Sequence, residues 1–201
     1  MTTISRAIPR PGGRSARVQA AVHQAASELL SEHGRAALTV PLIAARAGVT
    51  PSTVYRRWGD LADLLADVAM ERMRPDGDPA ETGSVAGDLQ AWVEQYRDEM
   101  SSEVGMGLMR DVLSARGGIV SEGRLPVPCQ CAAFTAAQIA TIVARGVARG
   151  EAVPEVAAVM DTVIAPIIYR SLFGAEPITA QHARDLLSAC LKDARTRRET
   201  A

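Results

Sequence analysis

The sequence predicts an all-α protein of about nine helices, and three observations carry that prediction. Aromatic residues make up only 3% of the 201 residues, whereas β-strands are rich in aromatic and β-branched residues. Alanine, the best helix former, is abundant along the whole chain. Apolar residues recur at spacings of three and four, and no segment has the alternation typical of a strand.

The first predicted helix covers residues 15–33 and is amphipathic. Its apolar residues fall on one face at Val18, Val22, Ala25 and Leu29. Gly34 follows directly, at a position where helix ends favour glycine. The preceding residues, 1–13, have no apolar core of signal-peptide length, and we expect them to form a flexible arm.

Residues 39–57 predict two short helices joined by a tight turn. Thr39 is a suitable N-cap for the first helix, and Thr50 followed by Pro51 is a suitable start for the second. Ala44 falls where the two helices cross and a larger side chain would clash, and Gly48 falls where the turn needs a positive φ. This arrangement is typical of a helix-turn-helix, whose second helix enters the major groove of DNA.

The rest of the chain is predicted to be helical apart from two interruptions. A connecting helix at 60–73 is followed by a linker at 74–87 that is rich in proline, glycine and aspartate. A loop at 120–127 contains glycine and proline. The further helices are expected at 89–100, 106–114, 134–149, 155–172 and 179–195. Pro166 inside one of them predicts a kink.

Charge is divided unevenly along the sequence. The net charge is −1, yet residues 1–59 carry eight arginines against two glutamates, which gives +6. Residues 60–201 carry 14 basic and 21 acidic side chains, which gives −7. A basic module on an otherwise acidic chain favours contact between that module and a polyanion.

The sequence shows no framework for metal binding, disulfides or export. The three cysteines, Cys129, Cys131 and Cys190, include no CxxC pair, so neither a zinc site nor a disulfide scaffold is predicted. No window approaches about 18 uninterrupted apolar residues, which is the length of a membrane-spanning helix. We therefore expect a cytoplasmic protein with no cofactor and no membrane contact.

Residues 39–68, TVPLIAARAGVTPSTVYRRWGDLADLLADV, resemble the DNA-binding region of the tetracycline-repressor (TetR) family of bacterial transcription regulators. The close resemblance covers about the first 70 residues, and the remainder matches in organisation. Two residues depart from the family pattern. Trp58 stands where the family often has phenylalanine, and Leu61 stands where it often has a lysine that contacts phosphate. The resemblance implies a DNA-binding domain at 14–59 and a ligand-binding and dimerisation domain at 60–201.

The helix-turn-helix supplies the candidate DNA contacts. Thr39 and Thr50 would bind phosphates at helix N-termini, and Tyr55 would reach a phosphate through its phenol. Arg56 and Arg57 carry forked donors that pair with guanine or with phosphate, and the sequence leaves both options open. Short side chains would allow close approach of the helix. The predicted contacts are Thr39, Thr50, Pro51, Ser52, Thr53, Tyr55, Arg56 and Arg57.

The second region supplies candidate ligand and dimer residues. The resemblance implies a homodimer on a palindromic DNA operator, released by a small and largely apolar effector. Candidate ligand contacts are Trp92, Tyr96, Met100, Met109 and Phe134. Candidate dimer contacts are Val159, Val163, Ile167, Leu187, Cys190 and Leu191. Both sets have spacings equally typical of an ordinary helical core.

Other classes of function have less support in the sequence. An enzyme is not expected, because no pattern of catalytic or metal-binding residues emerges. A second alternative is a helical protein-interaction module with no DNA target. In that case the positive charge of residues 1–59 would have no direct role in function. A redox-sensing regulator would use Cys129 and Cys131, although small buried residues are the simpler interpretation of that pair.

Overall fold

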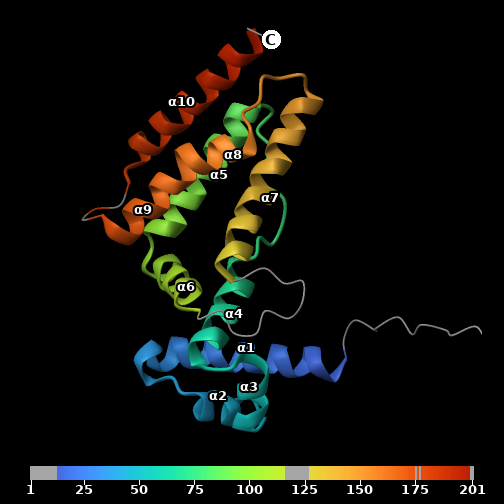
Figure 1. The fold of residues 1–201 in the computed structure, drawn as a ribbon, viewed down its shortest axis with the longest axis vertical. Helices are drawn as coiled ribbons and strands as arrows, with labels where there is room; N and C mark the ends of the chain where they lie inside the picture. The colour runs from blue at the N-terminus through green and yellow to red at the C-terminus, as the bar shows by residue number, and fades with distance from the viewer. Residues whose placement is uncertain (1–12, 116–126, 175, 177, 200–201) are drawn as a thin grey trace, which may run out of the picture.

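The structure is a computed structural model in which residues 13–115, 127–174, 176 and 178–199 are described. Its N-terminal end is a module in which one long helix packs with shorter ones (Figure 1). These elements are α1 (Arg14–His33), the 3₁₀ turn η1 (Arg35–Ala37), α2 (Val40–Arg46) and α3 (Pro51–Trp58). Helix α4 (Leu61–Met73) leaves this module and leads into the second region. The predicted flexible arm falls almost wholly on residues 1–12, which lie outside the described part of the chain.

The second region contains the remaining helices. They are α5 (Val85–Ser101), α6 (Glu103–Ser114), α7 (Val127–Ala148), α8 (Val156–Val159), η2 (Met160–Ile164), α9 (Ala165–Phe173) and α10 (Ala180–Glu199). Elements α8, η2 and α9 run continuously as one interrupted helix. With that helix counted once, the described residues form nine α-helices and no strand. The predicted all-α fold is confirmed.

Two apolar cores meet along α4. The first core packs α1 against the helix-turn-helix through buried residues such as Val22, Leu29 and Ile43. Leu64 and Leu65 of α4 belong to this core, whereas Ala69 and Met70 belong to the second core. Because side chains of one rigid helix are buried in both regions, a displacement of α4 must be felt by both.

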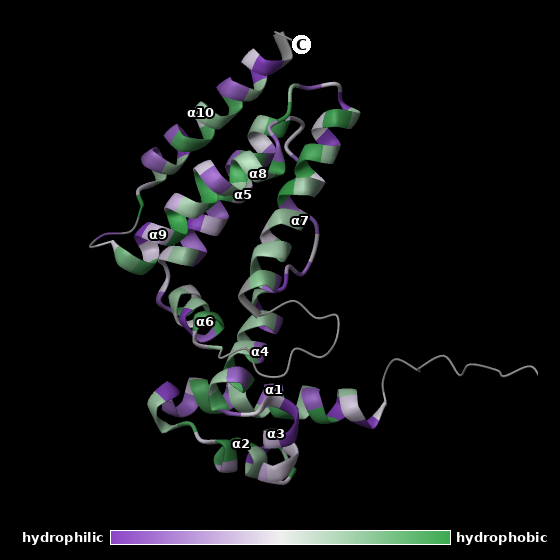
Figure 2. Ribbon diagram, in the orientation of Figure 1, coloured by the Kyte–Doolittle hydropathy of each residue, from purple (hydrophilic) through white to green (hydrophobic). Residues whose placement is uncertain are grey.

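The second core lies between α5, α7, the α8–α9 helix and α10. Helix α5 contributes Leu89, α7 contributes Ile139 and Ile142, and α9 contributes Ile167, all with no exposed surface. Figure 2 shows that α7 and the α8–α9 helix are apolar along most of their length, whereas α10 mixes apolar and hydrophilic residues.

Two of these helical stretches are more apolar than the sequence led us to expect. Cys129–Ala148 and Val156–Phe173 are long and apolar enough to cross a membrane by length and composition, a criterion that core helices of soluble proteins also meet. Both stretches pack against other helices of the same chain. Within these two stretches 28% and 22% are buried, and the exposed side chains of the second stretch include the large apolar residues Tyr169 and Phe173.

The interruption at η2 is the form that the predicted kink takes. Residues Met160–Ile164 adopt a π-helical turn that ends two residues before Pro166. Proline has no N–H to offer the carbonyl four residues earlier, and its ring crowds that carbonyl. A wider turn relieves the crowding while the helix continues, so the chain bulges at this point.

The remaining differences concern helix starts. Helix α5 begins at Val85, earlier than predicted, because the Ser84 hydroxyl accepts a hydrogen bond from the Gly87 N–H at 3.1 Å and caps the helix. Helix α7 begins at Val127, the last residue of the predicted loop and seven residues before the predicted start of the helix. Pro128 lies in the first turn of α7, where a missing N–H costs nothing. The rest of the predicted loop, 120–126, lies outside the described residues.

Candidate nucleic-acid interface and ligand cavity

The turn between α2 and α3 has the geometry predicted for a helix-turn-helix. Ala44 has no exposed surface where the helices cross, and Gly48 has a φ of 67°. At the start of α2, the Thr39 hydroxyl accepts the Leu42 N–H at 3.3 Å. The short helix α3 is therefore held at a fixed angle to α2.

One face of α3 is buried and the opposite face is open to solvent. Val54 and Trp58 pack into the first core, while Ser52, Tyr55 and Arg56 are exposed. Thr50 does not cap a backbone N–H. Its hydroxyl instead bonds those of Ser52 at 2.9 Å and Thr53 at 3.0 Å, and the three hydroxyls cluster at the start of the helix. Pro51 occupies the first helical position, as expected.

The arginines near α3 differ in how they are held. The Arg57 guanidinium donates to the Ser15 carbonyl at 3.0 Å and to Gln19 of α1, which ties α3 to α1. Arg46 pairs with Glu32 at 2.8 Å. Arg56 has neither an ion pair nor a hydrogen bond with any described residue, so its fork is free to meet an external partner.

A polar network joins α3 to α4 beneath the recognition face. The indole N–H of Trp58 donates to the Asp67 carboxylate at 2.8 Å. His23 of α1 lies 2.9 Å from the same carboxylate oxygen, and Gln19 donates to it at 3.3 Å. Sequence reasoning assigned Trp58 to packing alone, because the partner of its N–H is nine residues away on another helix.

A second polar contact links the N-terminal module to α6. Arg35 in η1 donates to the carboxylate of Asp111, which is 6% exposed. Burial raises the pKa of Asp111, and the neighbouring Arg35 opposes that rise. Helix α6 also packs against α4, so α6 contacts the module both directly and through the connecting helix.

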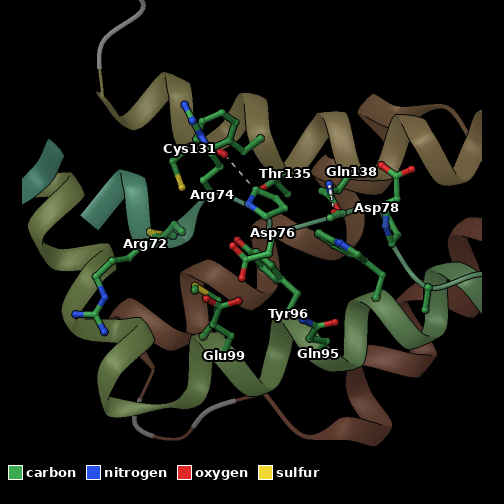
Figure 3. Close-up of a pocket in the computed structure, with 18 residues that line it drawn as sticks. Arg72, Arg74, Asp76, Asp78, Gln95, Tyr96, Glu99, Cys131, Thr135 and Gln138 are labelled. Atoms are coloured by element: carbon green, nitrogen blue, oxygen red, sulfur yellow. Dashed lines mark hydrogen bonds between the residues drawn. The ribbon is translucent and has the colours of Figure 1, made fainter. Parts of the chain in front are cut away.

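A cavity of about 360 Å³ opens between the end of α4, α5 and α7 (Figure 3). Four of the five predicted ligand residues line it: Trp92, Tyr96, Met100 and Phe134. The fifth, Met109, is buried in the second core and is not among the lining residues. The sequence missed the polar lining, which includes Asp76, Gln95, Glu99, Thr135 and Gln138.

Residues 74–79 form one wall of this cavity and are tied to α7; we call this segment the strap. Gln138 donates to the Gly77 carbonyl at 3.3 Å, and Arg145 donates to the Pro79 carbonyl at 2.7 Å. The Arg74 guanidinium lies over the Phe134 ring, 5.7 Å from its centre. The sequence indicated only a linker here, because its contacts are made with a helix some sixty residues later.

The six predicted dimer residues lie inside one chain. Val159, Val163 and Ile167 have no exposed surface, and Leu187 and Cys190 are also buried. Leu191 is partly buried against the same core. Within one chain these side chains pack against other helices, and their part in a dimer stays a prediction. The exposed face of α9 instead carries Tyr169 and Phe173.

The two cysteines of α7 have different surroundings. Cys129 is exposed and Cys131 is buried, because residues two apart in a helix point in different directions. Burial raises the pKa of the Cys131 thiol, and Glu99 raises it further, which lowers thiol reactivity. Within the described part of the chain, no group of three or more His, Cys, Asp and Glu side chains is arranged to hold a metal.

A helix-turn-helix with an open recognition face, attached to a helical domain that contains a cavity, defines a helix-turn-helix regulatory protein. The sequence matches two family models that agree with this class. Residues 23–68 match "Bacterial regulatory proteins, tetR family", and residues 79–190 match "Tetracyclin repressor-like, C-terminal domain". The chain belongs to the TetR family of helix-turn-helix transcription regulators and is not an enzyme.

Curated relatives carry related names. The HTH-type transcriptional regulator AqdR of Rhodococcus erythropolis is 31% identical over 69% of this chain and 65% of its own length. The uncharacterized regulator YdeS of Bacillus subtilis is 25% identical over 86% of this chain and 87% of its own. An uncharacterized HTH-type regulator of Mycobacterium tuberculosis is 43% identical, but the match spans only 30% of each chain.

Solved structures share the fold. The TetR family regulator SCO0332 has a TM-score of 0.59 at 23% identity, covering 88% of this chain and 97% of its own. The flavonoid-responsive regulator FrrA has a TM-score of 0.53 at 19% identity, covering 90% of this chain and 96% of its own. At such identities the likeness concerns the fold.

Proposed function

We propose that the protein is a homodimeric repressor that binds a palindromic DNA operator and is released when a small molecule occupies the cavity beside the strap. The observation that carries this proposal is the two-sided character of α3. Its inner face is fixed in the core by Val54 and Trp58, and its outer face offers Tyr55 and Arg56 to solvent. A rigid helix with an open polar face is what major-groove recognition requires.

Charge and helix length support a dimer. The net positive charge lies in residues 1–59, which carry eight arginines against two glutamates, and a recognition helix of eight residues covers few base pairs. Two copies on a palindrome would double the contacts. The uncovered apolar surface of α9, with Tyr169 66% and Phe173 73% exposed, is the kind of surface that a second copy would cover.

The assigned roles of the outer α3 residues follow from their contacts. Arg56, with no partner in the described chain, is the proposed reader of base edges. Arg57, anchored to Ser15 and Gln19, is proposed to meet phosphate or to position α3. Thr39, Thr50, Ser52, Thr53 and Tyr55 are proposed phosphate or close-approach contacts.

Release by a ligand requires a difference in affinity between two conformations. A ligand that bound both equally would shift nothing. The cavity includes residues of the α4 C-terminus and of the strap, and α4 is also anchored in the first core. A ligand that prefers one position of α4 would therefore alter the placement of α3.

The test begins with genomic fragments selected by the purified protein, followed by footprinting of the selected operator. Arg56→Ala is expected to weaken operator binding by about 1–3 kcal/mol and to relax preference at one base pair. Arg110→Ala, which removes an exposed arginine from α6, is the matched control and should leave binding unchanged. Operator affinity should also fall steeply with salt. An unchanged footprint for Arg56→Ala, or binding insensitive to salt, would contradict the proposed interface.

A further inference from the structure

The cavity beside the strap combines stacked rings with carboxylates, and this combination indicates a class of ligand. We propose that it binds a planar aromatic cation, such as a protonated heteroaromatic amine, rather than the neutral apolar effector that the sequence suggested. The claim that ligand binding relieves repression depends on the function proposed above. The claim that the ligand binds depends only on the residues of the cavity.

The aromatic wall offers ring faces to a flat ligand. Trp92 and Tyr96 are stacked, with ring centres 5.1 Å apart and planes 15° apart. Phe134 lines the cavity from α7, and the other two rings come from α5. The faces of aromatic rings carry partial negative charge, so they attract cations as well as other flat rings.

Two carboxylates of the cavity are unpaired within the described chain. Glu99 on α5 and Asp76 on the strap line the cavity, and neither side chain has an ion pair or hydrogen bond with a described residue. Asp78, by contrast, already pairs with Arg145 at 3.5 Å. Burial raises the pKa of the Cys131 thiol, and the negative charge of Glu99 raises it further. Burial also raises the pKa of the Tyr96 phenol; Cys131 adds to that rise, a hydrogen bond with Thr135 opposes it, and Glu99 adds a smaller rise. The same negative field favours a bound cation.

The protein already places a cation of its own against this wall. The Arg74 guanidinium lies over the Phe134 ring, whereas Figure 3 shows the Arg72 guanidinium directed away from Asp76 and Tyr96. A ligand cation that reaches Phe134 would compete with Arg74. Because Arg74 directly follows the last residue of α4, this competition acts on the end of the connecting helix.

The volume of the cavity limits the size of the ligand. A volume of about 360 Å³ lies at the lower end of the range for small-molecule sites. It suits a compound of two or three fused rings.

Three tricyclic probes of similar shape and different charge test the proposal on the full-length protein without DNA. They are proflavine, a cation, acridone, which is neutral, and anthracene-9-carboxylate, an anion. Titration calorimetry is expected to show proflavine binding at least about tenfold more tightly than either of the others. Glu99→Gln should weaken proflavine binding about tenfold and leave acridone unchanged. Asp98→Asn, the same type of change on the same helix outside the cavity, is the control.

A second variant is expected to bind proflavine more tightly rather than more weakly. Arg74→Gln removes the internal competitor and a positive charge, so it should tighten proflavine binding about threefold. Equal binding of the three probes by the wild-type protein would overturn the proposal. So would a Glu99→Gln variant that binds proflavine as tightly as the wild type does.

Operator binding by the ligand-free protein is measured separately with the same variants. A wild-type protein that binds the operator but does not bind proflavine refutes the ligand class and spares the proposed DNA-binding function. A wild-type protein that binds proflavine but not the operator refutes the proposed DNA-binding function and spares the ligand class.

Discussion

Trp58 differs from the phenylalanine of the family pattern, and this difference adds a hydrogen bond that packing alone does not reveal. The sequence resembles a family pattern with phenylalanine at this position, and an indole fills such a site as a larger apolar ring. In the structure its N–H donates to Asp67 on α4. The indole therefore links the recognition helix to the connecting helix through a directed bond.

Trp58→Phe is expected to lower the free energy of unfolding by about 1–2 kcal/mol, because the partly buried Asp67 carboxylate loses a donor. Urea unfolding measures this change. The chain's other tryptophan gives a matched control: Trp92 makes no indole hydrogen bond with a described residue, so Trp92→Phe should cost less. Equal losses for the two variants would show that ring volume, rather than the bond to Asp67, accounts for the effect.

Among the elements, helix periodicity and the helix-turn-helix could be predicted because both depend on local spacing. The small side chain of Ala44 predicts the helix crossing, and the backbone freedom of Gly48 predicts the turn. The strap could not be predicted as a cavity wall, because a segment rich in proline and glycine carries no periodicity and is defined by the α7 side chains Gln138 and Arg145. Likewise, the burial of Val159 depends on which helix covers it, and spacing is the same for an intrachain core and a dimer interface.

The contact between η1 and α6 is expected to stabilise the junction of the two regions. Arg35→Ala leaves the buried Asp111 carboxylate without its cation, and the free energy of unfolding should fall by about 1–2 kcal/mol. Asp111→Asn should cost less, because it removes the buried charge together with the pair. Adding Asp111→Asn to Arg35→Ala should therefore recover stability. Urea unfolding, with Arg110→Ala as the exposed control, decides this, and a double variant less stable than Arg35→Ala would refute it.

At the scale of the whole molecule, buried charge makes stability depend on pH. Asp88 has no exposed surface. Burial raises the pKa of its carboxyl, but hydrogen bonds from Thr82 and Arg149 outweigh burial and hold the pKa below its ordinary value. The folded chain therefore favours the ionised form. Its contribution is complete above the unfolded pKa of about 3.9 and is lost as the pH falls through the lower folded value.

Asp88→Asn should therefore reduce stability at pH 7 by about 2 kcal/mol and flatten the loss of stability in acid. Urea unfolding between pH 2 and pH 7 measures both effects. Asp161→Asn, at an exposed position in η2, should follow the wild-type curve. An Asp88→Asn variant whose acid limb is as steep as that of the wild type would place the acid sensitivity elsewhere.

The proposed dimer would cover apolar surface that a single chain leaves exposed. Tyr169 and Phe173 lie on α9 with ring centres 5.3 Å apart, and water is a poor environment for two such large exposed rings. If a second copy covers them, Tyr169→Glu with Phe173→Glu should yield a folded, helical monomer, because neither ring belongs to the core. Operator affinity should then fall at least about tenfold, since one recognition helix would bind alone. Light scattering after size exclusion measures the mass. Val104→Glu, at an exposed apolar position on α6, should remain dimeric, and a monomeric wild-type protein would remove α9 as the dimer interface.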